Sequence, residues 1–198
     1  MSSCTRMDDD RTLLAVLAAG RAERFGGGKL DAPCAGRALG EWATSAAEAA
    51  GFASRIIVVA DAPPSFVSRL KGWKIIHNPD AASGGIASSI RVASRAASAY
   101  ARLIIVLADM PLIKSAHLCA LAKTDGVVFT AYPDGSRGVP AAFPAQCFEA
   151  LANIISGAAS MNWGETVKTL SPPESDSLFD VDTAADLAEA DARLTRPR

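Results

Sequence analysis

Short apolar runs alternate with longer amphipathic stretches along the chain. The apolar runs lack the polar–apolar alternation of a half-exposed strand, and this pattern is typical of strands buried on both faces of a parallel sheet. Such a sheet needs helices on both faces. We therefore predict buried strands at residues Thr12–Ala18, 55–60, Lys74–His77, 102–108 and 126–130.

The stretches between these runs have the pattern of amphipathic helices. In one of them, Ile90, Ala93 and Ala97 recur at helical spacing. The last one begins at Thr183, and Asp186 three residues later resembles a capping box. Helices are expected at residues 41–50, 64–70, 86–100, 115–123 and from residue 183 onward. This alternation of strands and helices predicts a doubly wound α/β fold.

Length and composition fit one globular domain, with 198 residues, 49% of them hydrophobic and 21% charged. We expect a disordered lead over residues 1–10 and a single domain over residues 11–198. The stretch 156–177, which contains glycines and prolines, is expected to form loops around one short element and to cover the functional site. The net charge of −1 gives no general attraction to polyanions, so neither nucleic acid nor a membrane is expected as a partner.

The N-terminal residues do not resemble a secretion signal, because Asp8, Asp9 and Asp10 stand where such a signal would carry basic and then apolar residues. No apolar run approaches the ~20 residues of a membrane helix. The four cysteines form no C-x-x-C pair, so we expect reduced thiols and neither a zinc site nor a disulfide framework. Together these features predict a cytoplasmic protein.

A glycine-rich loop with two cations follows the first predicted strand. Gly20 and the glycines of residues 26–28 allow the backbone to approach a ligand closely, and Arg24 and Lys29 add positive charge. These are the parts needed to hold a triphosphate. The loop is not a Walker loop, because Leu30 follows the lysine, and it lacks the dinucleotide fingerprint. A flexible surface loop with incidental charges is the alternative interpretation.

The loop, read as L-A-A-G-x-x-x-R-F-G-x-x-K, resembles the signature of the MobA-like nucleotidyltransferases. The resemblance implies a Rossmann-like doubly wound fold, with a mostly parallel sheet and helices on both faces. It also implies that this loop wraps a nucleoside triphosphate, whose phosphates contact the arginine and the lysine. The nucleotide-binding residues that carry over are Leu17, Ala18, Ala19, Gly20, Arg24 and Lys29, and the last two are also catalytic candidates.

Two acidic segments could share a metal ion. Asp109 follows a buried strand, where open α/β sheets place their ligands, although an Asp-x-Pro turn is also an ordinary strand exit. A carboxylate facing a triphosphate needs a cation between them, and Mg²⁺ favours one or two carboxylates plus phosphates. In the family the Asp-Met-Pro aspartate binds magnesium, so by resemblance Asp109 is a metal ligand as well as a catalytic and a nucleotide-binding candidate. By resemblance Asp182 is the second ligand and a catalytic residue, with Asp180 nearby, although Asp182 or Thr183 could merely cap the last helix.

A middle segment leads from Asn78-Pro79 through two glycines to Ser88-Ser89. By itself it reads as a loop and a helix start. It also resembles the corresponding Asn-Pro to Ser-Ser segment of the cytidylyltransferase branch, which lies along the nucleoside. This resemblance makes Asn78, Gly85 and Ser88 nucleotide-binding candidates. The two histidines, His77 and His117, are expected to be structural.

The segments on the acceptor side depart from the family. Val139 stands where the family has a histidine, and Ala158 replaces an acidic residue. The loss of an imidazole and a carboxylate changes the hydrogen-bonding partners of a polar acceptor. The nucleotide half therefore matches the family, whereas the acceptor half is altered.

The resemblance implies a magnesium-dependent transferase that moves CMP from CTP to molybdenum-bound molybdopterin and releases pyrophosphate. CTP is favoured because the cytidylyl branch reads L-A-A-G, as here, while the guanylyl branch reads L-A-G-G. A guanylyl- or other nucleotidyltransferase with a different phosphorylated acceptor is one alternative. Another is a non-catalytic nucleotide-binding accessory protein of a molybdoenzyme. A molybdoenzyme or its chaperone would then be a partner.

Overall fold

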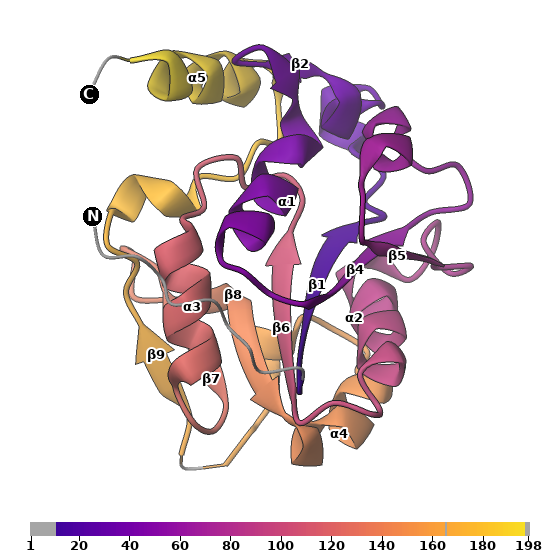
Figure 1. Ribbon diagram of the computed structural model, residues 1–198, viewed down its shortest axis with the longest axis vertical. Helices are drawn as coiled ribbons and strands as arrows, with labels where there is room; N and C mark the ends of the chain where they lie inside the picture. Colours follow the sequence, from indigo (N-terminus) through magenta and orange to yellow (C-terminus); the bar gives the residue numbers. More distant parts are fainter. Residues whose placement is uncertain (1–10, 165, 197–198) are drawn as a thin grey trace.

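The computed structural model describes residues 11–164 and 166–196, and its centre is a seven-stranded sheet in the order β5-β4-β1-β6-β8-β7-β9 (Figure 1). The strands are β1 (Thr12–Ala18), β4 (Ser54–Val59), β5 (Lys74–His77), β6 (Arg102–Leu107), β7 (Val128–Ala131), β8 (Arg137–Pro144) and β9 (Lys168–Leu170). A short hairpin, β2 (Pro33–Cys34) and β3 (Arg37–Ala38), stands apart from the sheet. All five predicted strands are present, with shifts of one or two residues at their ends. One of them was wrongly expected to be buried, because β5 lies at the edge of the sheet and most of its side chains are exposed.

The sheet is mostly parallel, as predicted, with one reversed strand. β1 pairs in parallel with β4 and β6, while β8 runs antiparallel to both β6 and β7. The sequence pattern missed β8 because Gly138 and Pro140 interrupt its apolar run. The pairing of β7 with β8 shifts register between Phe129 and Thr130, and such an irregularity accommodates a proline inside a strand.

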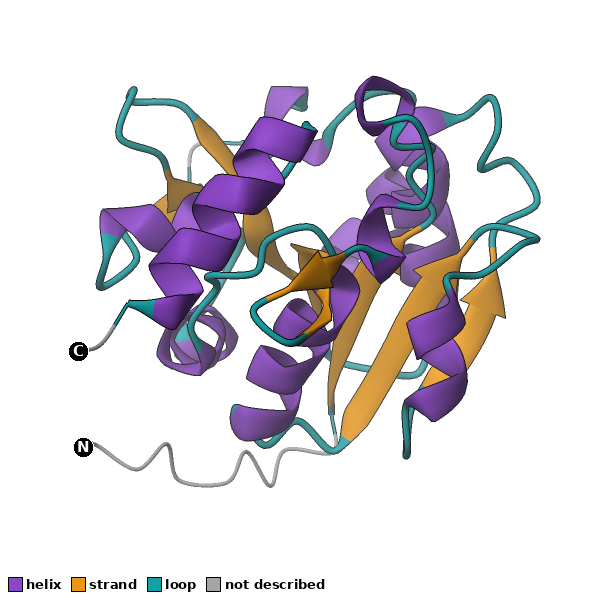
Figure 2. Ribbon diagram, turned by 90° about the horizontal axis from the view of Figure 1, so that it is seen from above, coloured by secondary structure: helices purple, strands orange, loops and turns teal. Residues whose placement is uncertain are grey.

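Helices cover both faces of the sheet (Figure 2). The even-numbered residues of β1 pack with α1, α3 and α5, and the odd-numbered residues of β1 pack with α2 and α4. This division follows from the strand geometry, since successive side chains point to opposite faces. The structure therefore has the Rossmann-like doubly wound architecture. The helices are α1 (Leu39–Ala49), α2 (Gly85–Ala96), α3 (Ser115–Lys123), α4 (Phe148–Ala152) and α5 (Ala184–Thr195).

Several local expectations need correction. The predicted helix at residues 64–70 is a 3₁₀ helix, Ser65–Arg69, and the helix expected to reach residue 100 ends at Ala96. Cys34 and Cys147 are free and buried, but Cys119 is disulfide-bonded, which contradicts the expectation that all four cysteines are reduced. The predicted lead, residues 1–10, lies outside the described residues.

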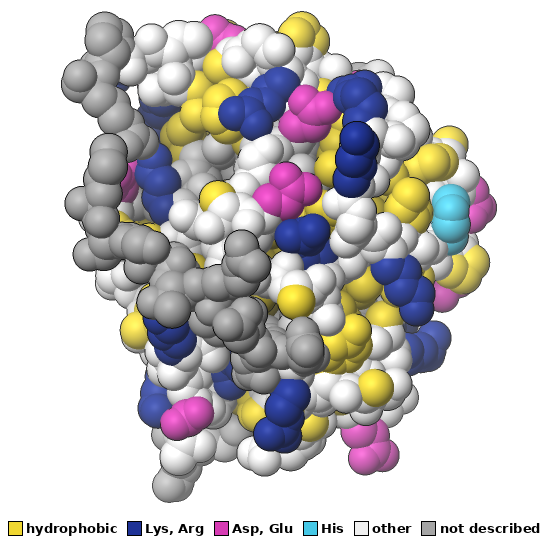
Figure 3. Space-filling view, in the orientation of Figure 1, with side chains coloured by type: hydrophobic (Ala, Val, Ile, Leu, Met, Phe, Trp, Pro, Cys, Tyr) yellow, Lys and Arg dark blue, Asp and Glu magenta, His cyan; other side chains and the backbone are white. Residues whose placement is uncertain are grey.

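The helices and the surface charges of the described residues bear on the predicted partners. None of the helices there combines the length and the apolar character needed to cross a membrane. On the face seen in Figure 3, basic and acidic side chains are interspersed, in agreement with the net charge of −1.

His117 is a structural residue on the buried face of α3. Its side chain is only 1% exposed, and its Nε2 lies 2.7 Å from Thr130 Oγ1. The Thr130 hydroxyl donates its own hydrogen to the Pro140 carbonyl oxygen at 2.6 Å, so the imidazole Nε2–H must be the donor to Thr130. Burial lowers the pKa of His117 to about 4, because the charged imidazolium would lose its hydration.

We expect His117 to make the protein less stable in mild acid. Its pKa is about 4 in the folded state, against 6.5 for an unperturbed histidine, so the unfolded chain binds the proton first as pH falls. The free energy of unfolding should therefore fall between pH 6.5 and pH 4, by up to about 3 kcal/mol. Urea unfolding at pH 7 and pH 4.5 measures this change. His117→Asn should make the free energy of unfolding less dependent on pH, whereas His77→Asn, at an exposed position, should not. If the wild type and both variants lose the same free energy between pH 7 and pH 4.5, the assignment to His117 is wrong.

Candidate active site

A cavity of about 400 Å³ lies at the carboxyl ends of β1 and β6. One wall is the end of β1 and the loop that follows it, with Lys29 and Leu30 where that loop returns. The opposite wall is the segment 81–86 at the start of α2, and Leu107 and Asp109 close the inner end. Because adjacent parallel strands end at the same edge of a sheet, β1 and β6 bring the loop and Asp109 together.

The loop after β1 turns back on itself through three consecutive glycines. Gly26, Gly27 and Gly28 have φ angles of +86°, +96° and +63°, in the left-handed region that favours glycine. This turn returns the chain to the sheet edge, where Lys29 begins the 3₁₀ helix Lys29–Asp31 with its side chain buried. Of the two basic residues in the loop, Lys29 is therefore buried inside the site, whereas the side chain of Arg24 is 76% exposed.

Lys29 is the centre of the charge network. Its ammonium group donates to Asp109 Oδ2 at 2.7 Å and to the Val181 carbonyl oxygen at 2.6 Å, and Asp182 Oδ1 lies 3.6 Å away. Arg24 extends the network, since its guanidinium lies 3.0 Å from Asp182 Oδ2. The two acids that the resemblance assigns to the metal are therefore gathered around the loop lysine.

The donor set at this point fits a divalent cation. Asp109 Oδ1 is buried and has no hydrogen-bond partner, so this carboxylate keeps one oxygen available for a ligand. Burial raises the pKa of the nearby Asp180 carboxyl, and the charges of Asp109 and Asp182 raise it further. The described residues bring together no group of three or more acidic, histidine or cysteine side chains suited to a metal. Two carboxylates suit Mg²⁺ in particular, because substrate phosphates and water complete its shell.

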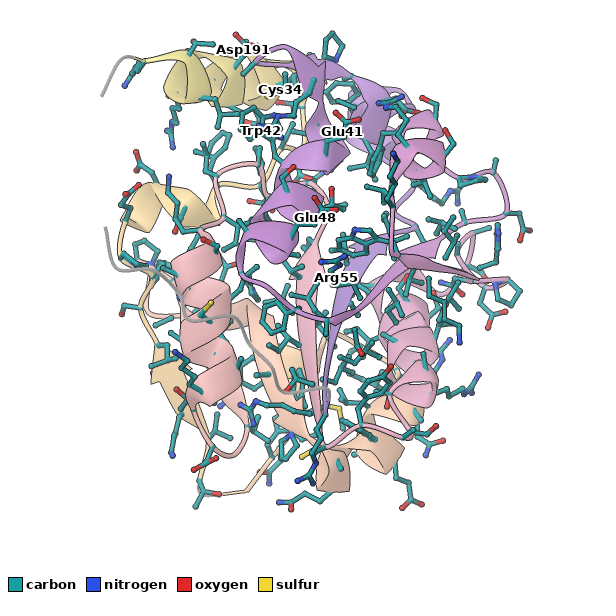
Figure 4. All side chains as sticks on the ribbon, in the orientation of Figure 1. Cys34, Glu41, Trp42, Glu48, Arg55 and Asp191 are labelled. Carbon is teal, nitrogen blue, oxygen red and sulfur yellow. The ribbon has the colours of Figure 1, made fainter. Side chains whose placement is uncertain are left out.

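Asp182 is held in place by the start of α5. Asp186 Oδ2 accepts hydrogen bonds from the backbone nitrogens of Asp182 at 3.1 Å and Thr183 at 2.7 Å, and the Thr183 hydroxyl caps the helix in return. The predicted capping box is therefore present. Further along the helix, Asp191 accepts a hydrogen bond of 2.7 Å from the Ala35 backbone at the tip of the β2–β3 hairpin (Figure 4). These contacts fix the helix, and with it the carboxylate of Asp182.

In the middle segment, residues 78–89, some side chains line the cavity and others are buried behind its wall. Asn78 is 1% exposed, and its side-chain amide donates to the hydroxyls of Ser88 at 2.8 Å and Ser89 at 3.1 Å. Its amide oxygen accepts from the Asp80 backbone. Gly85, with a φ of +53°, faces the cavity with space around it. Asn78 and Ser88 therefore shape this wall from behind.

Seven of the predicted residues line the cavity and four do not. Those in the lining are Leu17, Ala18, Ala19, Gly20, Lys29, Gly85 and Asp109. Arg24 and Asp182 lie beside it through their ion pairs, while Asn78 and Ser88 stand behind its wall. The stretch 156–177 was expected to form loops around one short element and to cover the site. Its described residues include both the 3₁₀ helix Ala158–Ser160 and the strand β9, and none of them is among these lining residues.

Sequence reasoning missed several lining residues. These are Arg21, Ala22, Leu30, Ala81, Ala82, Ser83, Ile86, Ser89 and Leu107. Ser89 could have been found from helical spacing, because it stands one turn after Gly85 on the same face of α2. Arg21 spans the mouth, since its guanidinium donates to the Ala82 carbonyl oxygen at 3.1 Å. Ile86 is 40% exposed and gives the mouth an apolar surface.

The residues that depart from the family on the acceptor side, Val139 and Ala158, pack in a hydrophobic core cluster. Ala158 is buried and Val139 is partly buried against the same core cluster. The Val139 carbonyl oxygen accepts a hydrogen bond of 2.5 Å from the Tyr132 hydroxyl. Burial raises the pKa of Tyr132 to about 12, with further contributions from the charges of Asp180 and Asp109, so this hydroxyl stays neutral.

Comparison with known proteins identifies a family. Residues 14–167 match the family described as the MobA-like NTP transferase domain. No curated protein matches the sequence at a significant level. The family match spans the glycine-rich loop, the middle segment and Asp109, and it stops before Asp182.

Solved structures share the fold at low sequence identity. Rv0371c of Mycobacterium tuberculosis is 24% identical, with a TM-score of 0.75 over 90% of this chain and 96% of its own; a second structure of that protein is a complex with manganese. A nucleotidyl transferase of Methanothermobacter, Mth528, has a TM-score of 0.78 at 20% identity, over 92% of this chain and 96% of its own. The molybdopterin-guanine dinucleotide biosynthesis protein A of Archaeoglobus fulgidus has a TM-score of 0.67 at 19% identity, over 92% and 98%.

We expect Asn78→Ala to destabilise the protein and to loosen the cavity wall. The substitution removes the amide that joins two serines and a backbone nitrogen, so the free energy of unfolding should fall by about 1–3 kcal/mol. Urea unfolding measures the loss. Asn153→Ala is the matched control, because that exposed amide only donates to the Glu149 carbonyl oxygen. If both variants lose the same small amount, the supporting role of Asn78 is wrong.

Proposed function

Because the chain belongs to the MobA-like NTP transferase family, we propose that it is a magnesium-dependent nucleotidyltransferase that transfers CMP from CTP to a phosphorylated acceptor and releases pyrophosphate. The favoured acceptor is molybdenum-bound molybdopterin. The observation that carries the proposal is the cavity at the ends of β1 and β6, where Lys29 and Asp109 meet the L-A-A-G turn. A nucleoside would fill the apolar part between Ala19 and Ile86, with its phosphates toward Lys29.

The chain's own residues supply positioning and charge. Arg24 and Lys29 would bind the triphosphate oxygens, and Asp109 and Asp182 would hold the magnesium ion. When bound, the ion neutralises charge on the phosphates and orients the α-phosphate. The acceptor phosphate is already ionised near neutral pH, so its in-line attack needs no protein base. Catalysis then rests on orientation and on stabilising the negative charge of the leaving pyrophosphate.

Two observations support a divalent metal. The unpartnered Asp109 Oδ1 is a buried oxygen that a cation would satisfy. Rv0371c, which shares the fold, has been crystallised in complex with manganese. Magnesium is the proposed ion here because the donor set is two carboxylates, and Mg²⁺ takes its remaining ligands from phosphate and water.

A different phosphorylated acceptor is the second candidate. Val139 and Ala158 are apolar, whereas the family resemblance implies an imidazole and a carboxylate at these positions. An acceptor with less polar surface on that side would suit these residues better, since unmatched polar groups lose their hydrogen bonds on binding. The nucleotide half of the reaction is the same for either acceptor.

A matrix of substrates tests both candidates. Purified protein with Mg²⁺ is given each of the four common nucleoside triphosphates, against molybdenum-loaded molybdopterin, a sugar phosphate and no acceptor. Pyrophosphate release and the mass of the product are measured. Release with CTP and molybdenum-loaded molybdopterin supports the first candidate, and release only with another acceptor supports the second. A protein that binds nucleotide but releases no pyrophosphate in any combination is an accessory binding protein, and the proposal of a transferase is then wrong.

We expect Asp109→Asn to reduce kcat by about a hundredfold or more, because the charge-neutralising cation loses its buried ligand. Steady-state pyrophosphate release measures the effect, and circular dichroism checks that the variant is folded. Glu149→Gln is the control, since it removes an exposed carboxylate on α4 far from the cavity. Near-normal turnover of Asp109→Asn in magnesium would exclude this residue as a ligand.

We expect a preference for CTP over GTP that depends on Ala19. Ala19 lines the cavity, and on the proposed function its methyl group would restrict the room for a purine, whereas glycine would enlarge the pocket. A single methyl group discriminates by about 1–3 kcal/mol, so Ala19→Gly should narrow the ratio of kcat/KM between CTP and GTP by roughly tenfold. Ala145→Gly, at an exposed position outside the cavity lining, is the control and should leave the ratio unchanged. Faster turnover of GTP than CTP by the unmodified protein would refute the assignment.

A further inference from the structure

The ammonium group of Lys29 lies in a cage of three oxygen atoms. We define this oxygen cage as Asp109 Oδ2 at 2.7 Å, the Val181 carbonyl oxygen at 2.6 Å and Asp182 Oδ1 at 3.6 Å from Lys29 Nζ. Lys29 is only 8% exposed, so these contacts replace water around the charge. An ammonium group has three hydrogens to donate, and the two short contacts are charge-assisted hydrogen bonds.

Two of the three cage oxygens belong to the carboxylates that would hold the metal. The inference rests on the proposed function in this respect, because that function assigns Asp109 and Asp182 to magnesium. We propose that Lys29 stands in for the cation in the nucleotide-free protein, and that the metal takes its place only when a triphosphate offers Lys29 other oxygens. Lys29 then has two sets of partners, the cage in the free protein and the phosphates in the complex.

The energetic reason is the burial of the charges. A metal ion that entered the cage alone would displace Lys29 and leave a buried ammonium group without a partner, which is strongly unfavourable. If Lys29 stayed, two like charges would face each other at close range. A triphosphate removes this conflict by pairing with the displaced lysine. Metal and nucleotide should therefore bind with positive coupling, and each should strengthen the binding of the other.

The surroundings of Lys29 allow this exchange by a movement of its side chain. Lys29 lines the nucleotide cavity and also a neighbouring cavity of about 180 Å³, so open space adjoins it on more than one side. The 3₁₀ helix Lys29–Asp31 is anchored at its last residue, because the Asp31 carboxylate accepts hydrogen bonds from the Ser65 backbone at 2.8 Å and the Phe66 backbone at 3.0 Å. The Cα position stays fixed while the flexible four-carbon stem turns from the cage to the phosphates.

The test is the binding of Mn²⁺, as a spectroscopically visible probe for magnesium, to the full-length protein without nucleotide. Free Mn²⁺ is measured by electron paramagnetic resonance for the wild type, Lys29→Met, Lys114→Met and the double variant Lys29→Met/Asp109→Asn. Lys114 is the matched control, since its ammonium pairs with Glu174 at 3.3 Å and lies outside the nucleotide cavity. We expect Lys29→Met to bind Mn²⁺ about tenfold more tightly than the wild type or more. Lys114→Met should match the wild type, and the double variant should lose the gain.

A second arm adds CTP to the wild-type protein and measures Mn²⁺ retained with the protein on ultrafiltration, because free Mn²⁺ and its CTP complex pass the filter. Retention should rise by about tenfold or more. Circular dichroism and thermal unfolding establish that each variant is folded. If Lys29→Met does not fold, the retention of Mn²⁺ by the wild-type protein is the deciding measurement. Tight retention of Mn²⁺ in the absence of nucleotide then overturns the inference.

The outcomes separate the inference from the proposed function. Equal affinity of the nucleotide-free wild type and Lys29→Met for Mn²⁺ overturns the inference, even if the protein releases pyrophosphate from CTP. A tenfold gain in Lys29→Met, lost again in the double variant, supports Lys29 as the internal cation. If that gain occurs while no nucleoside triphosphate yields pyrophosphate, the proposed function is wrong and the oxygen cage remains.

Discussion

The ion pair between Lys29 and Asp109 is the interaction on which the site depends. The two residues are 80 positions apart in the sequence, and the same ammonium group binds the Val181 carbonyl oxygen 152 positions away. It therefore joins the glycine-rich loop, the end of β6 and the segment before α5 around one buried charge. A buried ammonium group without these oxygens would be costly, so the folded chain must bring all three segments together.

The order of the strands makes this meeting possible. β1 lies between β4 and β6, and Leu17 is paired with Leu107 in the register of β1 and β6. The loop after β1 and the Asp109 turn therefore leave the sheet side by side at its carboxyl edge. The backbone bond from Val181 to the Asp109 carbonyl oxygen, at 3.0 Å, adds the C-terminal segment to the same edge. The fold thus places a compact polar centre where the cavity opens, while the two apolar cores lie on either side of the sheet.

The two halves of the site follow different constraints. The proposed nucleotide half uses backbone turns and a small set of charges, and its loop and Asp109 lie within the residues that match the family. The proposed acceptor half would depend on single side chains such as Val139 and Ala158, which pack in a hydrophobic core cluster. On that proposal, a change at such a position would alter which acceptor fits without disturbing the glycine-rich loop. Membership of the family therefore indicates the class of reaction more strongly than the identity of the acceptor.

The sequence by itself determined the buried parallel strands, the glycine-rich loop and the Thr183–Asp186 cap, because each depends on residues that are neighbours along the chain. It could not predict β8, whose Pro140 is accommodated only by the irregular pairing with β7. Nor could it separate Ser89, which lines the cavity, from Asn78 and Ser88, which support the wall from behind. The sequence also could not predict the oxygen cage around Lys29, since strand order and register decide which distant oxygen atoms come close to its ammonium group. Local patterns specify the elements, whereas side-chain direction and long-range pairing are settled only when the elements pack.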